Sequence, residues 1–71
     1  MNPNSKYFEA HYDELLERYP EQWVAIYDQE VVETDPDARK LLGDLKDEGI
    51  PLGKVLVKYM PREEEVFILT G

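Results

Sequence analysis

The placement of proline and glycine divides this chain into short segments. Pro20, Pro36, Pro51 and Pro61 each stand at a boundary between stretches of different pattern, and Gly49 adds a further stop before Pro51. Proline lacks the backbone N–H and fixes φ, so it does not continue a helix or a central strand. Each segment between these residues is therefore expected to form one helix, one strand or one hairpin.

Two segments have the periodicity of amphipathic helices. The first covers about residues 5–18, with Asn4 or Ser5 as its cap, and its apolar stripe recurs at helical spacing. The second covers about residues 36–48, with Asp35 as the cap and Pro36 at the first helical position. The apolar side chains are Phe8, Tyr12, Leu15 and Tyr19 in the first helix and Ala38, Leu41, Leu42 and Leu45 in the second.

Three segments have the composition of strands. Residues 22–27 are apolar on both faces, which predicts a buried central strand. A turn at Asp28-Gln29 or Gln29-Glu30 leads to a second strand over residues 30–34, whose acidic flanks suit an edge position. In the third strand, residues 54–60, alternation places Tyr59 and Met60 on opposite faces.

These elements predict an α+β fold with the order α-β-β-α-β and a small antiparallel sheet of strand order 2-1-3. We expect both helices to cover one face of the sheet, in two layers. The domain is expected to comprise residues 1–61. Residues 62–71 form a tail with the apolar run Val66-Phe67-Ile68-Leu69. This tail either adds a short fourth strand, folds onto the open sheet face or pairs with another chain.

The composition restricts the chemistry. The 71 residues carry 16 acidic and 8 basic side chains, a net charge of -8, which argues against binding to nucleic acid or to anionic membranes. There is no cysteine and only one histidine, His11, so disulfides and sites built from thiolates or several histidines are excluded. We expect no cofactor and no metal. Without an apolar run of about 20 residues or an export signal, a cytoplasmic protein is expected.

Catalytic side chains are scarce. Ser5 is the only serine, Thr34 and Thr70 are the only threonines, and His11 is the only standard base. A catalytic triad needs a nucleophile, a base and an orienting group that converge from different elements. We therefore expect that this chain is not an enzyme.

Several motifs in combination resemble a known family. They are Tyr7-Phe8, Leu15-Leu16, Tyr19-Pro20, Trp23-Val24-Ala25, Gly49-x-Pro51 and Val55-Leu56-Val57-x-Tyr59-x-Pro61. The family consists of short bacterial and archaeal proteins and is known only as a domain of unknown function. The resemblance covers about residues 7–61 and departs from the pattern at Gln29, where glycine is expected. The shared positions are helix ends, core and turns, so the resemblance implies a fold and no catalytic residue.

The small size and the apolar tail favour a non-catalytic protein-interaction module, such as an adaptor, regulator or inhibitor. We expect it to bind another protein, or a second copy as a homodimer, and the acidic rim to select a basic partner. The expected contact patch is Tyr59, Met60, Phe67 and Leu69. Two alternatives stay open: a small-molecule or metal-ion binder or weak enzyme that uses His11, and an acidic mimic of nucleic acid.

Overall fold

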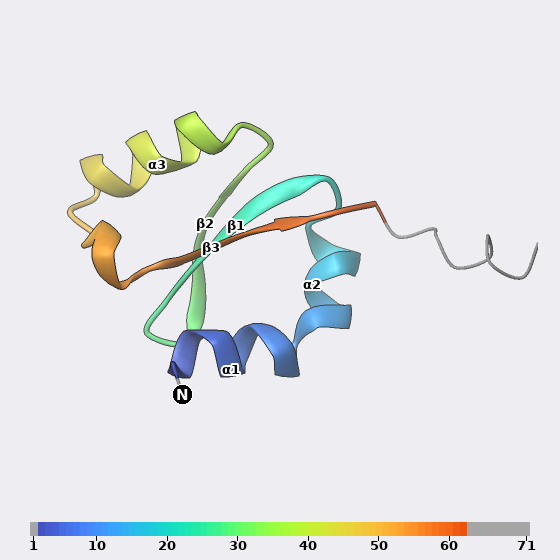
Figure 1. The fold of residues 1–71 in the computed structure, drawn as a ribbon. Coiled ribbons are helices and arrows are strands. Elements are labelled where there is room, and N and C mark those ends of the chain that lie inside the picture. The colour runs from blue at the N-terminus through green and yellow to red at the C-terminus, as the bar shows by residue number, and fades with distance from the viewer. Residues whose placement is uncertain (1, 63–71) are drawn as a thin grey trace, which may run out of the picture.

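The structure is a computed structural model, and it describes residues 2–62 of the chain. Its elements in order are α1 (Pro3–Ala10), α2 (Tyr12–Arg18), β1 (Gln22–Tyr27), β2 (Glu30–Asp35), α3 (Ala38–Asp47), a 3-10 turn η1 (Leu52–Lys54) and β3 (Leu56–Met60), as Figure 1 shows. The predicted α+β class and element order are confirmed. Phe67, Leu69 and the rest of residues 63–71 lie outside the described residues, and so does the fourth strand that was one of three alternatives for the tail.

The three strands form one sheet in the order β2-β1-β3, as predicted. Strand β1 is antiparallel to both neighbours, so β2 and β3 run parallel to each other on either side of it. In β1 the residues Val24, Ala25 and Ile26 are completely buried. This burial explains why the most apolar strand takes the central position.

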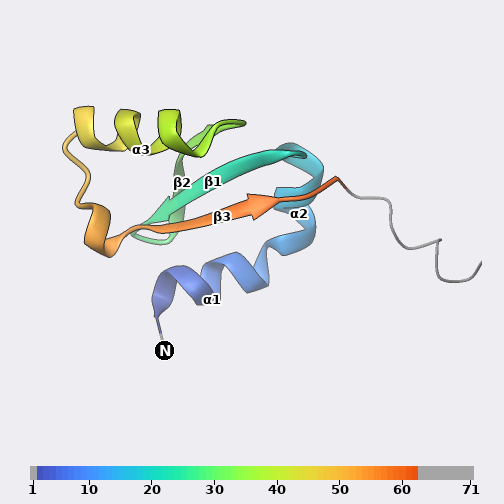
Figure 2. The same cartoon turned by 45° about the horizontal axis from the view of Figure 1, so that its top comes forward.

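The helices lie on opposite faces of the sheet (Figures 1 and 2). Val24 and Ile26 point to the face covered by α1 and α2, where they pack with Leu15 and Met60. Ala25 points to the other face, where it packs with Leu41 and Leu45 of α3. The prediction that both helices share one face is therefore wrong. Because successive side chains of β1 point to opposite faces and those from Trp23 to Tyr27 are apolar or aromatic, each face needs a cover of its own.

The predicted first helix is two helices that meet at His11. Asn2 caps α1 by accepting from the backbone N–H of Asn4 at 2.8 Å, and Pro3 follows in the first turn. The cap is therefore two or three residues earlier than predicted. At His11 the backbone leaves helical geometry, with φ -113° and ψ 18°. The break lets α2 leave the direction of α1 and follow the end of the sheet (Figure 2).

The second helix is shorter than predicted because Asp37, not Asp35, is its cap. The Asp37 carboxylate accepts from the backbone N–H of Arg39 at 2.9 Å, while Asp35 ends β2. The helix buries Leu41 and Leu45, but Leu42 is 41% exposed and does not belong to the buried face. After α3, η1 includes Lys54, the residue expected to begin the third strand, and β3 starts at Leu56.

Candidate interaction surface

The predicted contact patch is divided by the structure. Tyr59 is 44% exposed, whereas Met60 is completely buried against Leu15, Val24 and Ile26. The two side chains point to opposite faces of β3, as the alternation predicted. Phe67 and Leu69 lie outside the described residues. Of the four residues, Tyr59 is thus the one whose side chain is on the surface of the described part of the chain.

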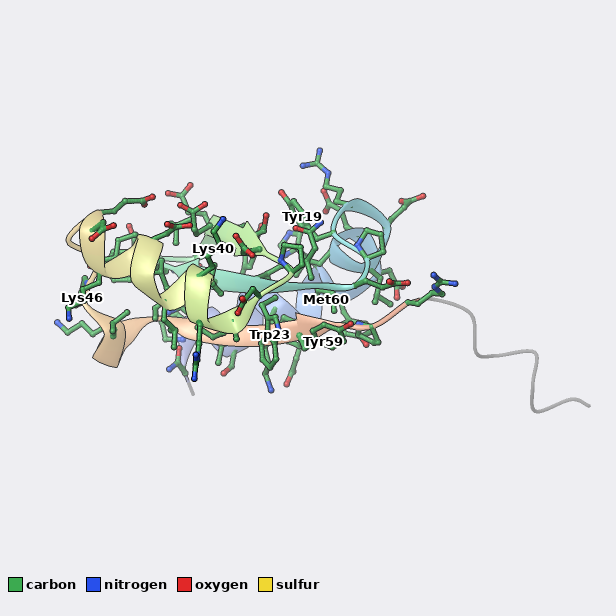
Figure 3. The ribbon with its side chains drawn as sticks, turned by 90° about the horizontal axis from the view of Figure 1, so that it is seen from above. Tyr19, Trp23, Lys40, Lys46, Tyr59 and Met60 are labelled. Atoms are coloured by element: carbon green, nitrogen blue, oxygen red, sulfur yellow. The ribbon has the colours of Figure 1, made fainter. Side chains whose placement is uncertain are left out.

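Tyr59 lies beside Trp23, on the α3 side of the sheet. Their ring centroids are 5.2 Å apart and the ring planes are inclined by 57°. Figure 3, which views the molecule from the α3 side, shows the two residues next to each other beyond the beginning of α3. Trp23 is partly buried and packs against the cluster of Ala25, Leu41 and Leu45. The Trp23 ring therefore packs against the core and contacts the exposed ring of Tyr59.

The strand register extends this pair into a row across the sheet. Trp23 is opposite Tyr59 of β3 on one side and opposite Asp35 of β2 on the other. Residues directly opposite each other on antiparallel strands share a face. The Asp35 carboxylate is held in place because its Oδ1 accepts from the backbone N–H of Asp37 at 2.8 Å. The register therefore places Asp35, Trp23 and Tyr59 in one row across this face of the sheet.

The row ends at an open edge of the sheet. Within residues 2–62, no strand pairs with the outer edge of β3. Lys58 and Tyr59 are both exposed on this strand, and Lys58 Nζ lies 5.5 Å from the centroid of the Phe8 ring on the α1 side. Residues of β2 are mostly half-buried, and β2 packs beside α3. Of the two edges, β3 therefore carries the more accessible side chains.

The candidates for catalysis are placed in other parts of the fold. The ring of His11 stacks on Tyr7 with centroids 4.2 Å apart, and its Nδ1 lies 3.0 Å from the backbone oxygen of Tyr7. Ser5 is in the first turn of α1, and Thr34 is on β2 opposite Val24. In the part of the chain that the structure describes, no group of three His, Asp or Glu side chains is arranged to hold a metal ion.

An open depression lies near the end of β3. It is lined by Leu16, Glu17, Pro20, Glu21 and Arg62. Glu21 and Arg62 form an ion pair across it, between exposed side chains. Exposed pairs of this kind contribute little to stability.

The far end of α3 carries a group of like charges. The pKa of Glu48 is raised by a side-chain hydrogen bond with Glu33, by desolvation, and by the negative charges of Glu33, Asp44 and Asp47. Glu48 also follows the C-terminal end of α3, where the helix dipole disfavours a negative charge. The negative charges at this end of the molecule therefore repel one another at neutral pH.

Sequence reasoning treated Trp23 as a core residue and Asp35 as a helix cap, so it missed the row. The predicted strand order already made Trp23 and Tyr59 neighbours in adjacent strands. What was missing was the register. The pairing of Trp23 with Asp35 depends on the β1–β2 turn and on the bulge between Ala25 and Ile26. The pairing of Trp23 with Tyr59 depends on the register of β1 and β3, which are far apart in the chain.

Comparisons with known proteins agree with the resemblance in the sequence. A family model described as a family of unknown function (DUF5678) matches residues 14–63. These residues include β1, β2, α3 and β3, and α1 precedes them. No curated protein and no solved structure matches the chain. No helix among the described residues is long and apolar enough to cross a membrane.

Proposed function

The chain belongs to the family of unknown function DUF5678, and we propose that it acts as a small non-catalytic protein-interaction module: an adaptor, regulator or inhibitor of a partner protein. Its contact surface consists of the outer edge of β3 together with Trp23 and Tyr59, and we name it the β3 edge surface. The observation that carries the proposal is the 44% exposure of Tyr59 beside a strand edge that no other described strand covers. Aromatic residues of this kind are enriched at protein interfaces.

The proposed mode of binding is strand addition. An exposed edge strand offers backbone N–H and C=O groups to an extended segment of another chain. The hydrogen bonds supply affinity, and the side chains beside the edge supply specificity. Tyr59 and Trp23 would contact the side chains of the segment that point to the α3 side.

Met60 is not a contact residue in this proposal, although the sequence analysis expected it to be one. Because its side chain is buried between the sheet and α2, it holds β3 in place and does not touch the partner. Phe67 and Leu69, outside the described residues, stay predicted contact residues. We propose a cytoplasmic location, since a chain without cysteine gains nothing from an oxidising compartment.

A non-catalytic role agrees with the state of His11. Its Nδ1 is directed at the Tyr7 backbone oxygen and its ring lies against the Tyr7 ring. The side chain therefore has a structural partner in α1.

Photocrosslinking in cells that naturally carry this gene tests the proposal. A photoreactive phenylalanine analogue replaces Tyr59 in one variant of the full chain and Tyr12 in the other. Tyr12 is a matched control because it is 37% exposed and also rests on one aromatic neighbour, Phe8, at 5.4 Å. We expect a discrete protein adduct from position 59 and not from position 12. The same adducts from both positions, or none from position 59, would contradict the proposal.

A further inference from the structure

We propose that the β3 edge surface binds an extended acidic segment of a partner protein, with a carboxylate side chain opposite Lys58 and apolar side chains opposite Val57 and Tyr59. This inference rests on the proposed function and adds the chemistry of the partner. It differs from the expectation of a basic partner, which came from the net charge, because the charge at this edge is not that of the whole molecule.

Strand β3 lies in a basic segment of an acidic protein. Residues 49–62 include Lys54, Lys58 and Arg62 and contain no aspartate or glutamate, so all 16 acidic residues lie elsewhere in the chain. Lys54 and Lys58 are exposed. Among the described residues neither of them forms an ion pair, whereas Arg62 pairs with Glu21. The described part of the edge therefore offers two cations to an anionic partner.

Lys58 is within reach of a strand that is added to this edge. It pairs with Val24 in the register of β1 and β3, and its Nζ lies 5.5 Å from the centroid of the Phe8 ring, so its side chain points to the α1 side. An added strand lies about 4.8 Å from β3, and Cβ atoms of directly opposite residues are about 4.5–5.5 Å apart. A carboxylate opposite Lys58 therefore pairs with it across a single strand spacing.

The neighbouring positions of β3 favour apolar side chains. Val57 and Tyr59 alternate with Lys58 and point to the α3 side. Val57 is half-buried there, and Tyr59 is 44% exposed and contacts Trp23. An added strand in which acidic and apolar residues alternate thus places its carboxylates on the Lys58 side and its apolar side chains beside Val57 and Tyr59.

An acidic peptide segment fits this edge better than a second copy or a nucleic acid does. A second copy that pairs through its own β3 brings another Lys58 to the same edge, and like charges opposite each other on neighbouring strands are unfavourable. A nucleic acid cannot continue the backbone hydrogen bonds of the sheet, and the net charge of -8 repels its phosphates. For a short peptide the distant acidic residues matter less, since the Debye length at physiological ionic strength is about 8 Å.

Three labelled peptides test the inference. The first is Ser-Val-Glu-Val-Glu-Val-Ser with a dye at its N-terminus and an amide at its C-terminus; the other two carry glutamine or lysine in place of both glutamates. Fluorescence anisotropy follows their binding to the full chain at an ionic strength of about 0.15 M. We expect the glutamate peptide to bind about two- to fivefold more tightly than the glutamine peptide, and the lysine peptide to bind most weakly. The net charge of -8 alone would give the opposite order.

Reversal of one charge locates the effect. Lys58→Glu is expected to reverse the order, so that the lysine peptide binds most tightly. Lys40→Glu is the matched control because it changes the net charge by the same amount, and Lys40 is exposed on α3, on the opposite face of the sheet from the Lys58 side chain (Figure 3). This variant is expected to keep the order of the unmodified chain. Circular dichroism checks that each variant is folded.

Three outcomes for the unmodified chain would overturn the inference: equal binding of the glutamate and glutamine peptides, tightest binding of the lysine peptide, or no binding of any peptide at about 1 mM. An order that survives in Lys58→Glu would overturn it as well, because the carboxylates then bind elsewhere. Tighter binding of a single-stranded oligothymidylate than of the glutamate peptide would assign the cations to nucleic acid instead. The crosslinking at position 59 reports contact whatever the charge of the partner, so failure of the inference is distinguishable from failure of the proposed function.

Discussion

Asn4 is the polar side chain that connects the N-terminal helix to the rest of the molecule. It is 6% exposed and lies in the first turn of α1. Its Nδ2 donates to the backbone oxygen of Lys54 at 3.1 Å, and its Oδ1 accepts from the backbone N–H of Gln29 at 2.9 Å. One side chain therefore holds α1, the β1–β2 turn and η1 together.

Replacement of Asn4 by alanine is expected to lower the free energy of unfolding by about 1–3 kcal/mol, because a partly buried donor (Gln29 N–H) and acceptor (Lys54 carbonyl) lose their partner. Urea denaturation measures the change. Ser5→Ala, one residue along the same turn, is the control and is expected to change stability by less than about 0.5 kcal/mol. Equal losses in both variants would show that the position, and not the hydrogen bonds, is responsible.

Gln29 adopts a backbone conformation that favours glycine. Asp28 and Gln29 have φ of 56° and 60°, which are the values of a type I′ hairpin turn, where Asp-Gly is preferred. Gln29→Gly is expected to raise the free energy of unfolding by about 0.5–1 kcal/mol, since a side chain in this region is strained. Gln29→Ala keeps the strain and is expected to give no gain. Thermal unfolding compares them, and a lower midpoint for the glycine variant would contradict the prediction.

Among the elements, α3 decides the architecture because it covers the second face of the sheet. Leu41 is completely buried on Ala25, and its neighbour Leu42 is 41% exposed. Leu41→Ala is expected to cost about 2–5 kcal/mol through lost burial and the cavity that it leaves. Leu42→Ala is the matched control, with an expected cost below about 0.5 kcal/mol. Similar losses from both substitutions would mean that α3 does not face the sheet as described.

Glu48, at the C-terminal end of α3, makes the free energy of unfolding depend on pH. The raised pKa of Glu48 means that the folded chain binds this proton more tightly than the unfolded chain. The resulting stabilisation is fully present below the ordinary pKa of 4.5 and is lost as the pH rises through the raised value. At neutral pH the charged Glu48 is left beside Glu33 and the helix end.

Glu48→Gln tests this dependence because glutamine stays neutral and still hydrogen-bonds to Glu33. We expect the variant to be more stable than the unmodified chain at about pH 7 and equal to it at about pH 4. Denaturation at a series of pH values gives the difference. Glu30→Gln, an exposed carboxylate for comparison, is expected to show no such trend. If the difference in stability between Glu48→Gln and the unmodified chain did not change with pH, packing and not charge would be its cause.

For the whole molecule, the excess of negative charge is the dominant electrostatic feature. A net charge of -8 on 71 residues makes the compact state repel itself. Salt is therefore expected to raise the unfolding midpoint as ionic strength increases from about 0.01 M to about 0.15 M, over which the Debye length falls from about 30 Å to about 8 Å. Sucrose at matched osmolality controls for non-ionic effects. An unchanged midpoint in salt would show that the charges are already balanced locally.

The sequence by itself determined the elements and their order in the sheet. Proline and glycine set the boundaries, the apolar β1 took the centre, and the acidic flanks of β2 marked an edge strand. These properties depend on near neighbours in the chain, where periodicity and backbone restrictions act directly. The two apolar faces of β1 even contained the signal for a helix on each side, although the two-layer expectation overlooked it.

Only the tertiary structure decided which side chains meet across the sheet. The burial of Met60 and Asn4, the exposure of Leu42 and the row from Asp35 to Tyr59 all depend on the register of the strands and on the face that each helix covers. A shift of one residue in register would reverse the face of every side chain in a strand. Contacts between segments far apart in the chain determine the strand register and the face that each helix covers. The local sequence pattern does not encode these contacts.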